Sequence, residues 1–217
     1  MLVKDVMDGH PVTATPDDPV AEVRRLMRAR HTAYVPVVED GNILKGLATR
    51  HSLMINPDLV GSHDIITLSQ FVADLKIKKA MIKGPDLIAI HQDQTIEEAS
   101  KLMLDEEVGC LPVVERDMLQ GIVTRDDLLA QFTEMMYADL PSVRVTIRMP
   151  MVKGEMVKLV NALGRAGLGI FASGSIREHS GEEYCRMVVK IRNASLDDVE
   201  GIVSNIPGQE IVDIRNM

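Results

Sequence analysis

The sequence has few aromatic residues: its 217 residues include no tryptophan, three tyrosines and three phenylalanines. Proteins that bind single-stranded nucleic acid stack bases on aromatic side chains, so this scarcity argues against that class. The formal charge of −8 argues against nucleic acid and anionic membranes, because both carry negative charge that the protein repels. We therefore expect neither nucleic acid nor a membrane among the partners.

Long apolar runs and paired cysteines are also missing. No stretch approaches the roughly 20 apolar residues that span a bilayer, and residues 1–5 lack the pattern of a signal peptide. These absences predict a cytoplasmic protein. Cys110 and Cys185 form no Cys-x-x-Cys motif and lie in apolar segments, which favours buried free thiols. The histidines lack the i, i+4 spacing of helix-borne ligands, so we predict no metal site.

Common catalytic motifs are absent as well. The sequence contains no Gly-x-Ser-x-Gly, no phosphate-loop Gly-x-x-x-x-Gly-Lys and no His-Glu-x-x-His. The turn at residues 173–175 has two serines but no adjacent base that the sequence reveals. We therefore predict a protein that is not an enzyme.

What the sequence does contain is an internal repeat. The segment 44–54 returns as 119–129, with Gly121 lying 75 residues after Gly46. The Tyr-Val-Pro-Val-Val-Glu strand pattern at 34–39 returns 76 residues later as Cys-Leu-Pro-Val-Val-Glu. A helical pattern and a short lead-in precede both copies at nearly the same offset. Segments repeated in one order with near-constant spacing indicate a duplication.

The second copy of this segment has the features of a nucleotide site. Residues 119–129 read as a strand, a sharp turn and a helix, and Thr124 with Asp127 forms a capping box. A helix start offers unpaired N–H groups to a phosphate, and Arg125 adds a cation that can reach one. Asp127 adds an acceptor for sugar hydroxyls. The alternative is that Thr124 and Asp127 only cap a helix.

These repeated motifs resemble the cystathionine β-synthase (CBS) domain, a β-α-β-β-α unit that occurs as a tandem pair. The resemblance rests on the two Pro-Val-Val-Glu strands and on Gly-Ile-Val-Thr-Arg-Asp-Asp at 121–127. The resemblance implies an α+β fold with a CBS pair over 1–137. Its parts are repeat 1 at about 1–57, a connecting helix at about 64–77 and repeat 2 at about 78–137. It also implies a cleft for AMP, ATP or another adenosine compound.

The resemblance implies two pseudo-equivalent sites. The stronger one joins a sugar- and phosphate-binding motif to early strands, and its residues are Thr124, Arg125, Asp127, Val12, Thr13, Ala14, Ala33, Tyr34 and Val35. The mirrored site has a serine where the family has aspartate, and its residues are Thr49, Arg50, Ser52, Ile90, Cys110 and Leu111. A hydroxyl cannot offer an anionic acceptor to both ribose hydroxyls, so we expect the mirrored site to bind more weakly.

The pattern after a linker at 138–142 is different. Strand and helix periodicities over 142–217 follow the order β-α-β-β-α-β, which predicts a ferredoxin-like sheet covered on one face by two helices. This order resembles the ACT domain, a regulatory module that often binds amino acids. The resemblance implies an effector site near the backbone of Gly154, Gly167, Leu168 and Gly169. The alternative is a plain split β-α-β domain used for dimerisation, because the family's acidic residue before the first of these glycines is missing.

A CBS pair followed by an ACT-like domain is the arrangement of the acetoin-utilisation protein B type. The whole chain is therefore expected to be a non-catalytic regulatory sensor that binds an adenosine nucleotide and requires no cofactor. An apolar stripe within 68–75 and the ACT-like sheet edge predict a homodimer or higher even oligomer. The other expected partners are small-molecule effectors and an unidentified regulated protein. The competing hypothesis is a structural dimerisation adaptor without a small-molecule ligand.

Overall fold

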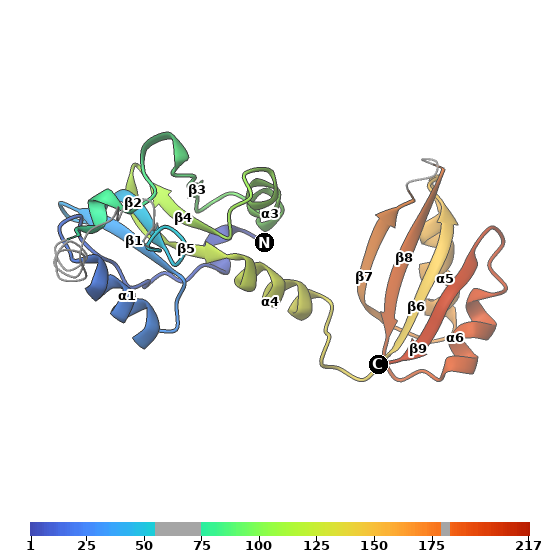
Figure 1. Cartoon of the computed structure of the whole chain (residues 1–217). Helices are drawn as coiled ribbons and strands as arrows, with labels where there is room; N and C mark the ends of the chain where they lie inside the picture. The colour runs from blue at the N-terminus through green and yellow to red at the C-terminus, as the bar shows by residue number, and fades with distance from the viewer. Residues whose placement is uncertain (55–74, 179–182) are drawn as a thin grey trace, which may run out of the picture. The chain divides into compact units, whose positions relative to one another are not determined.

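The structure is a computed structural model that describes residues 1–54, 75–178 and 183–217 (Figure 1). The chain forms two compact units, Met1–Leu129 and Ala130–Met217. The connecting helix predicted at 64–77 lies almost entirely outside the described residues, as does most of its apolar stripe. No helix in the described ranges has the length and apolarity needed to cross a membrane. The domain boundaries placed at 137 and 142 remain a prediction.

The first unit is built on a five-stranded sheet with the order β1-β2-β5-β4-β3. The strands are β1 Tyr34–Glu39, β2 Ile43–Thr49, β3 Ile90–His91, β4 Cys110–Glu115 and β5 Met118–Thr124. The helices are α1 Val20–Ala29, α3 Ile96–Asp105 and α4 Arg125–Met135, with short 3-10 helices η1 Val3–Asp5, η3 Ile77–Lys79 and η4 Gly84–Asp86. β1-β2 and β4-β5 are antiparallel pairs, and they are the two consecutive strands of each β-α-β-β-α repeat. Each repeat has its own apolar core, in which one helix packs against its hairpin.

The lead-in of the first repeat packs against the second repeat. Within residues 1–8, Val3 is fully buried in the core of the second repeat. Asp8 pairs with Ile122 of β5 through two backbone hydrogen bonds of 2.9 and 3.0 Å. This close approach requires a glycine, because a Cβ at Gly121 would lie 2.5 Å from the carbonyl oxygen of Asp8.

The lead-in of the second repeat packs against the first repeat in the same way. Within residues 75–82, Ile77 is fully buried in the core of the first repeat, and Ile82 pairs with Leu47 of β2. Here Gly46 allows the approach, since its Cβ would lie 2.7 Å from the carbonyl oxygen of Ile82. The predicted repeats therefore exchange their lead-ins in space.

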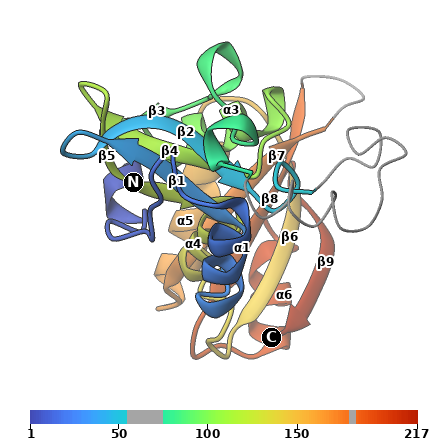
Figure 2. The same cartoon turned by 60° about the vertical axis from the view of Figure 1, so that its left-hand side comes forward.

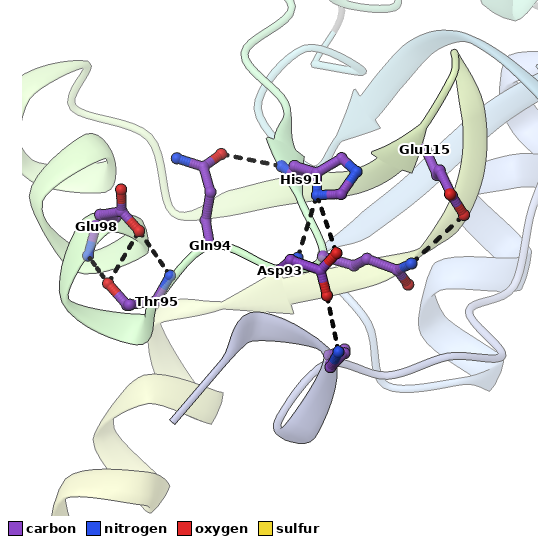
Figure 3. Close-up of polar contacts among 8 residues, drawn as sticks. His91, Asp93, Gln94, Thr95, Glu98 and Glu115 are labelled. Carbon is purple, nitrogen blue, oxygen red and sulfur yellow. Dashed lines mark hydrogen bonds and ion pairs between the residues drawn. The ribbon is translucent and has the colours of Figure 1, made fainter.

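Two equivalent ion pairs mark this exchange. Lys4 Nζ lies 2.7 Å from Asp93 Oδ1 of the second repeat, and Lys78 Nζ lies 2.7 Å from Asp17 Oδ1 of the first. Figure 3 shows the Asp93 carboxylate pointing to the lead-in at the start of the chain. Both pairs are exposed, and exposed ion pairs add little to stability because water and salt screen them. The two ion pairs show that the two lead-ins occupy equivalent positions on the opposite repeats.

Three local features differ from what the sequence pattern predicts. The Asp18-Pro19 pair predicts Asp18 as the N-cap of α1, but the N-cap is Pro19, because the Asp18 carboxylate accepts hydrogen bonds from Thr15 instead. The pattern at 11–14 predicts a strand, and the structure has one bridge there, between Ala14 and β1. The pattern after Thr49 predicts a short helix, whereas residues 50–53 form turns.

The second unit has the predicted order β-α-β-β-α-β. Its elements are β6 Val143–Pro150, α5 Glu155–Arg165, β7 Ile170–Arg177, β8 Tyr184–Ile191, α6 Leu196–Val203 and β9 Glu210–Asn216. The strands form an antiparallel sheet in the order β7-β8-β6-β9. Alternate residues of β6 and β8 meet α5 and α6 in one apolar core, so both helices cover the same face of the sheet (Figure 2). The other face is called the open face below.

Candidate functional site

The first motif turn lies where β2 ends. The backbone N–H of Thr49 donates to Ser52 Oγ at 3.0 Å, and the backbone N–H of Ser52 donates to Thr49 Oγ1 at 2.9 Å. These reciprocal bonds hold the turn although no helix follows in residues 50–53. The backbone of Arg50 is fixed by a hydrogen bond from its N–H to the carbonyl of Ala33, which comes just before β1.

The second motif turn has the same design at the end of β5. Asp127 Oδ2 accepts hydrogen bonds from the Thr124 backbone N–H at 2.7 Å and from Thr124 Oγ1 at 2.6 Å. The backbone N–H of Arg125 donates to the carbonyl of Gly109, which precedes β4. The predicted capping box is therefore present. One carboxylate oxygen of Asp127 is used by the cap, and a ligand would have to use the other.

Tyr34 and Cys110 occupy equivalent positions between these two turns. Tyr34 is the strand partner of Thr49, and Cys110 is the strand partner of Thr124. Burial raises the pKa of the Tyr34 hydroxyl, and the nearby cations Arg125 and Arg50 oppose that rise. The ring of Tyr34 is thus in reach of the charges of both turns.

Cys110 is the buried neighbour of this tyrosine. Burial, and secondarily the charge of Asp127, raises the pKa of the Cys110 thiol to about 12. Both cysteines of the chain are free and buried, as predicted. Cys110 is therefore a neutral apolar wall at physiological pH, without thiolate reactivity.

A cavity of about 420 Å³ opens beside Tyr34 and Cys110. Five predicted site residues line it: Ala33, Tyr34, Thr49, Arg50 and Cys110. The cavity therefore combines residues that the sequence assigned to two different sites. Its remaining walls are Leu47, His51, Ile82, Asp86, Leu87, Ile88, Glu107, Val108 and Gly109. Apolar side chains dominate, with the Arg50 cation after β2 and the carboxylates of Asp86 and Glu107 from the second repeat.

The other predicted residues do not line this cavity. The side chains of Val35, Ile90 and Leu111 are buried in the cores of the two repeats, so only their backbone can face a ligand. Ala14 is also buried in the core of the first repeat, and Val12 and Thr13 precede it on a partly exposed segment. The guanidinium of Arg125 donates to the carbonyl of Met103 at 3.5 Å.

Sequence reasoning missed the carboxylates of the cavity. Asp86 ends the 3-10 helix η4 and Glu107 lies in the turn after α3, and neither segment carries a periodic pattern or a recognisable motif. The repeat offset supplies a usable signal: Glu107 lies 76 residues after His31, and both have left-handed backbone, with φ of 54° and 52°. The same turn therefore closes α1 and α3, and in the second repeat it carries an acid to the cavity.

In the second unit, the predicted effector residues surround α5. Gly154 caps the start of the helix with φ of 94°, and Gly167 follows its end with φ of 74°. Leu168 packs against the core, and Gly169 leads into β7. The positive φ angles of Gly154 and Gly167 account for glycine at these two positions without any ligand. A cavity described in this unit is lined by other residues.

Comparisons with known proteins concern chiefly the first unit. The family profile described as CBS domain matches residues 3–56 and 72–134. The CBS domain-containing protein YhcV of Bacillus subtilis is 28% identical over 126 residues, which are 58% of this chain and 81% of that protein. The profile ends at residue 134, so it assigns no family to the C-terminal sheet.

Two solved structures share the fold of this unit. A putative acetoin utilization protein (AcuB) from Vibrio cholerae matches with a TM-score of 0.53 and 23% identity, covering 64% of this chain and 95% of that chain. CBSX2, a protein of Arabidopsis thaliana whose structure is known in complex with AMP, matches with a TM-score of 0.51 and 21% identity. That match covers 62% of this chain and 97% of that chain. At these identities the likeness is one of fold.

Proposed function

The chain belongs to the CBS-domain family, and from this membership we propose that it is a non-catalytic regulatory sensor that binds an adenosine nucleotide of the AMP, ADP or ATP type in its first unit. The observation that carries the proposal is the cavity beside Tyr34, which the first motif turn lines and whose tyrosine lies near the charged side chains of Arg50 and Arg125. Its volume of about 420 Å³ is within the ordinary range of small-ligand sites.

The walls of the cavity suit the parts of a nucleotide. Leu47, Leu87 and Val108 offer an apolar slot for a base, and the ring of Tyr34 can stack on it. Arg50 supplies a cation for a phosphate. Thr49 and the carboxylates that face the cavity can bind ribose hydroxyls. This cavity belongs to the turn of the mirrored site, and the stronger predicted site would use Thr124, Arg125 and Asp127 in the same roles.

Ligands of relatives support this assignment. CBSX2 binds AMP, and the CBS pair of protein MJ0100 binds 5′-methylthioadenosine and S-adenosyl-L-methionine. These compounds share an adenosine group and differ in what is attached to it. We propose adenosine as the recognised part, with no cofactor required and no turnover.

We further propose that the second unit is an ACT-like module in an acetoin-utilisation protein B type arrangement. Its strand order is compatible with that assignment. Its binding of a second effector near Gly154 and Gly167 belongs to the same proposal. In this scheme, occupancy of either unit changes the affinity of the protein for an unidentified regulated protein.

An exposed apolar stripe on α5 favours a homodimer. Met156, Val157 and Val160 are 47, 58 and 46% exposed, although they are apolar and lie on one helix. Burial of such a surface against its own copy would be isologous. This surface also supports the alternative function, a dimerisation adaptor without a ligand. Light scattering of the full chain at tens of micromolar tests the dimer, and a monomer contradicts it.

Calorimetric titration of the full chain with AMP, ADP and ATP tests the sensor function. Saturable binding of one of them is expected, together with a thermal shift that grows with nucleotide concentration. Arg50→Met should weaken binding about tenfold or more, because a charge-assisted hydrogen bond is lost. Arg30→Met is the matched control, since Arg30 follows α1 and lies outside the cavity.

Two results contradict the sensor function. Absence of heat and of any thermal shift with all three nucleotides at millimolar concentration would favour the adaptor. Sustained release of phosphate from ATP that Arg50→Met abolishes would show an enzyme.

A further inference from the structure

Lys190 is a buried cation on the open face of the second sheet. Its residue is only 2% exposed, and it lies on β8 between core-facing Val189 and Ile191. The ammonium donates one hydrogen bond, to the carbonyl of Tyr137 at 2.8 Å. Within the described ranges that carbonyl is its one acceptor. Lysine is rarely buried without a paired acid, so this ammonium has capacity for an anion.

The other cations on the same face are paired. Arg144 and Arg215 both contact Asp213, and Arg148 and Arg186 both contact Glu178. Glu210 is the strand partner of Arg148, so four arginines and Lys190 face three carboxylates, and the face is locally positive in a chain whose net charge is −8. In the parts of the chain that the structure describes, no carboxylate lies within 4.0 Å of Lys190 Nζ.

A cavity of about 400 Å³ adjoins this lysine, entirely within residues 130–217. Its apolar walls include Phe132, Met136, Ile176 and Val188, and Lys190 and Arg144 supply its positive charge. Such a volume matches ordinary small-ligand sites. A mostly apolar cavity with a buried cation suits a ligand with one anionic end and an apolar body.

Gly174 keeps this cavity open. It lies opposite Val188 in the β7-β8 pair, and a Cβ built on it would meet only Met136 Sδ at 4.0 Å. Its backbone is not left-handed, so the strand conformation does not require a glycine. A larger side chain would therefore fit the backbone and occupy the cavity.

We propose that this cavity is a binding site for a small organic carboxylate with an apolar body, whose carboxylate pairs with Lys190. The site is separate from the nucleotide cavity, and from the glycines around α5. The second unit would then sense an apolar carboxylic acid through its open face.

Methyl NMR of the full-length protein with hexanoate as the probe tests the site. Hexanoate should shift the methyl resonances of Met136 and Met217 saturably, because both residues line the cavity. Hexanamide, which has the same body without charge, should bind about tenfold more weakly. Lys190→Met should reduce the affinity for hexanoate to that of hexanamide. Lys153→Met, an exposed control outside the cavity, should change nothing.

Gly174→Leu keeps the lysine and fills the cavity, so it should abolish the shifts caused by both compounds. Equal binding of hexanoate and hexanamide overturns the proposal, as does unchanged hexanoate binding in Lys190→Met. If Lys190→Met does not fold, Gly174→Leu decides: hexanoate shifts that persist in this variant overturn the site.

Discussion

Substitution of Asp127 by alanine separates a structural role from a ligand role. Asp127 Oδ2 accepts two short hydrogen bonds from Thr124, so alanine removes an N-terminal cap of α4. Loss of such a cap costs about 0.5–2 kcal/mol of stability. A loss of about 1 kcal/mol lowers the melting temperature of a unit of this size by roughly 4 °C.

The effect on nucleotide affinity should be larger. Asp127 does not line the cavity beside Arg50, so its ligand role concerns the second nucleotide site, at the turn after β5. If its second carboxylate oxygen accepts from a ribose hydroxyl there, alanine removes a charge-assisted hydrogen bond worth about 1.5–3 kcal/mol. That loss corresponds to about ten- to a hundredfold in affinity. Calorimetric titration with the nucleotide that binds best measures it directly, and thermal unfolding without ligand measures the cap.

Ser52→Ala is the matched control. Ser52 forms the same reciprocal hydrogen bonds with Thr49 that Asp127 forms with Thr124. Replacement of Ser52 should cost about as much stability as replacement of Asp127. It removes no anionic acceptor, so nucleotide affinity should change little. If Asp127→Ala loses stability and keeps both affinity and stoichiometry, Asp127 is only a cap and the ribose role is refuted.

Three further predictions use the packing of the site and of the sheets. Gly109→Ala places a Cβ against the Tyr34 hydroxyl and should cost about 1–3 kcal/mol of stability. Tyr34→Phe should restore most of this stability, because the next atom of the ring, Cζ, lies 3.4 Å from the added Cβ. No recovery of stability in denaturant titrations of the double variant would contradict this contact. Gly46→Ala should destabilise by at least as much, because its Cβ meets backbone, and thermal unfolding at wild-type level would exclude the close contact. A hydrogen bond from Arg186, with others, holds the pKa of the Glu178 carboxyl below its usual range, so the stability that it contributes is present above pH about 4.5 and is lost as pH falls below that value. Glu178→Gln should therefore reduce the loss of stability that occurs as pH falls below about 4.5. An unchanged loss would show that the ion pairs of Glu178 with Arg148 and Arg186 contribute nothing to stability.

The hairpins and most helices could be predicted from the sequence because their signals are local. Alternating apolar residues with a turn fixed β1-β2 and β4-β5, and helical spacing fixed α3 and α5. The cap of α1 was wrong because Asp18 has two possible partners, and its carboxylate binds Thr15 instead of a helix N–H. Local competition of this kind is invisible in the sequence pattern.

The exchange of the lead-ins could not be predicted, because it depends on distant pairing. The segments around Lys4 and Lys78 are alike, so either could pack against either repeat, and spacing does not decide between them. For the site, the motif turns followed from the repeat and Tyr34 from the resemblance to the CBS family. The contributions of Asp86 and Glu107 did not, because a 3-10 helix and a turn without sequence motifs bring them to the cavity.

The exchanged lead-ins have a consequence for how the first unit holds together. Val3 completes the core beside the second hairpin and Ile77 completes the core beside the first, so each repeat supplies a segment that the other repeat buries. Neither repeat therefore has its complete core without the other, and loss of either lead-in would expose a buried apolar surface on the opposite repeat.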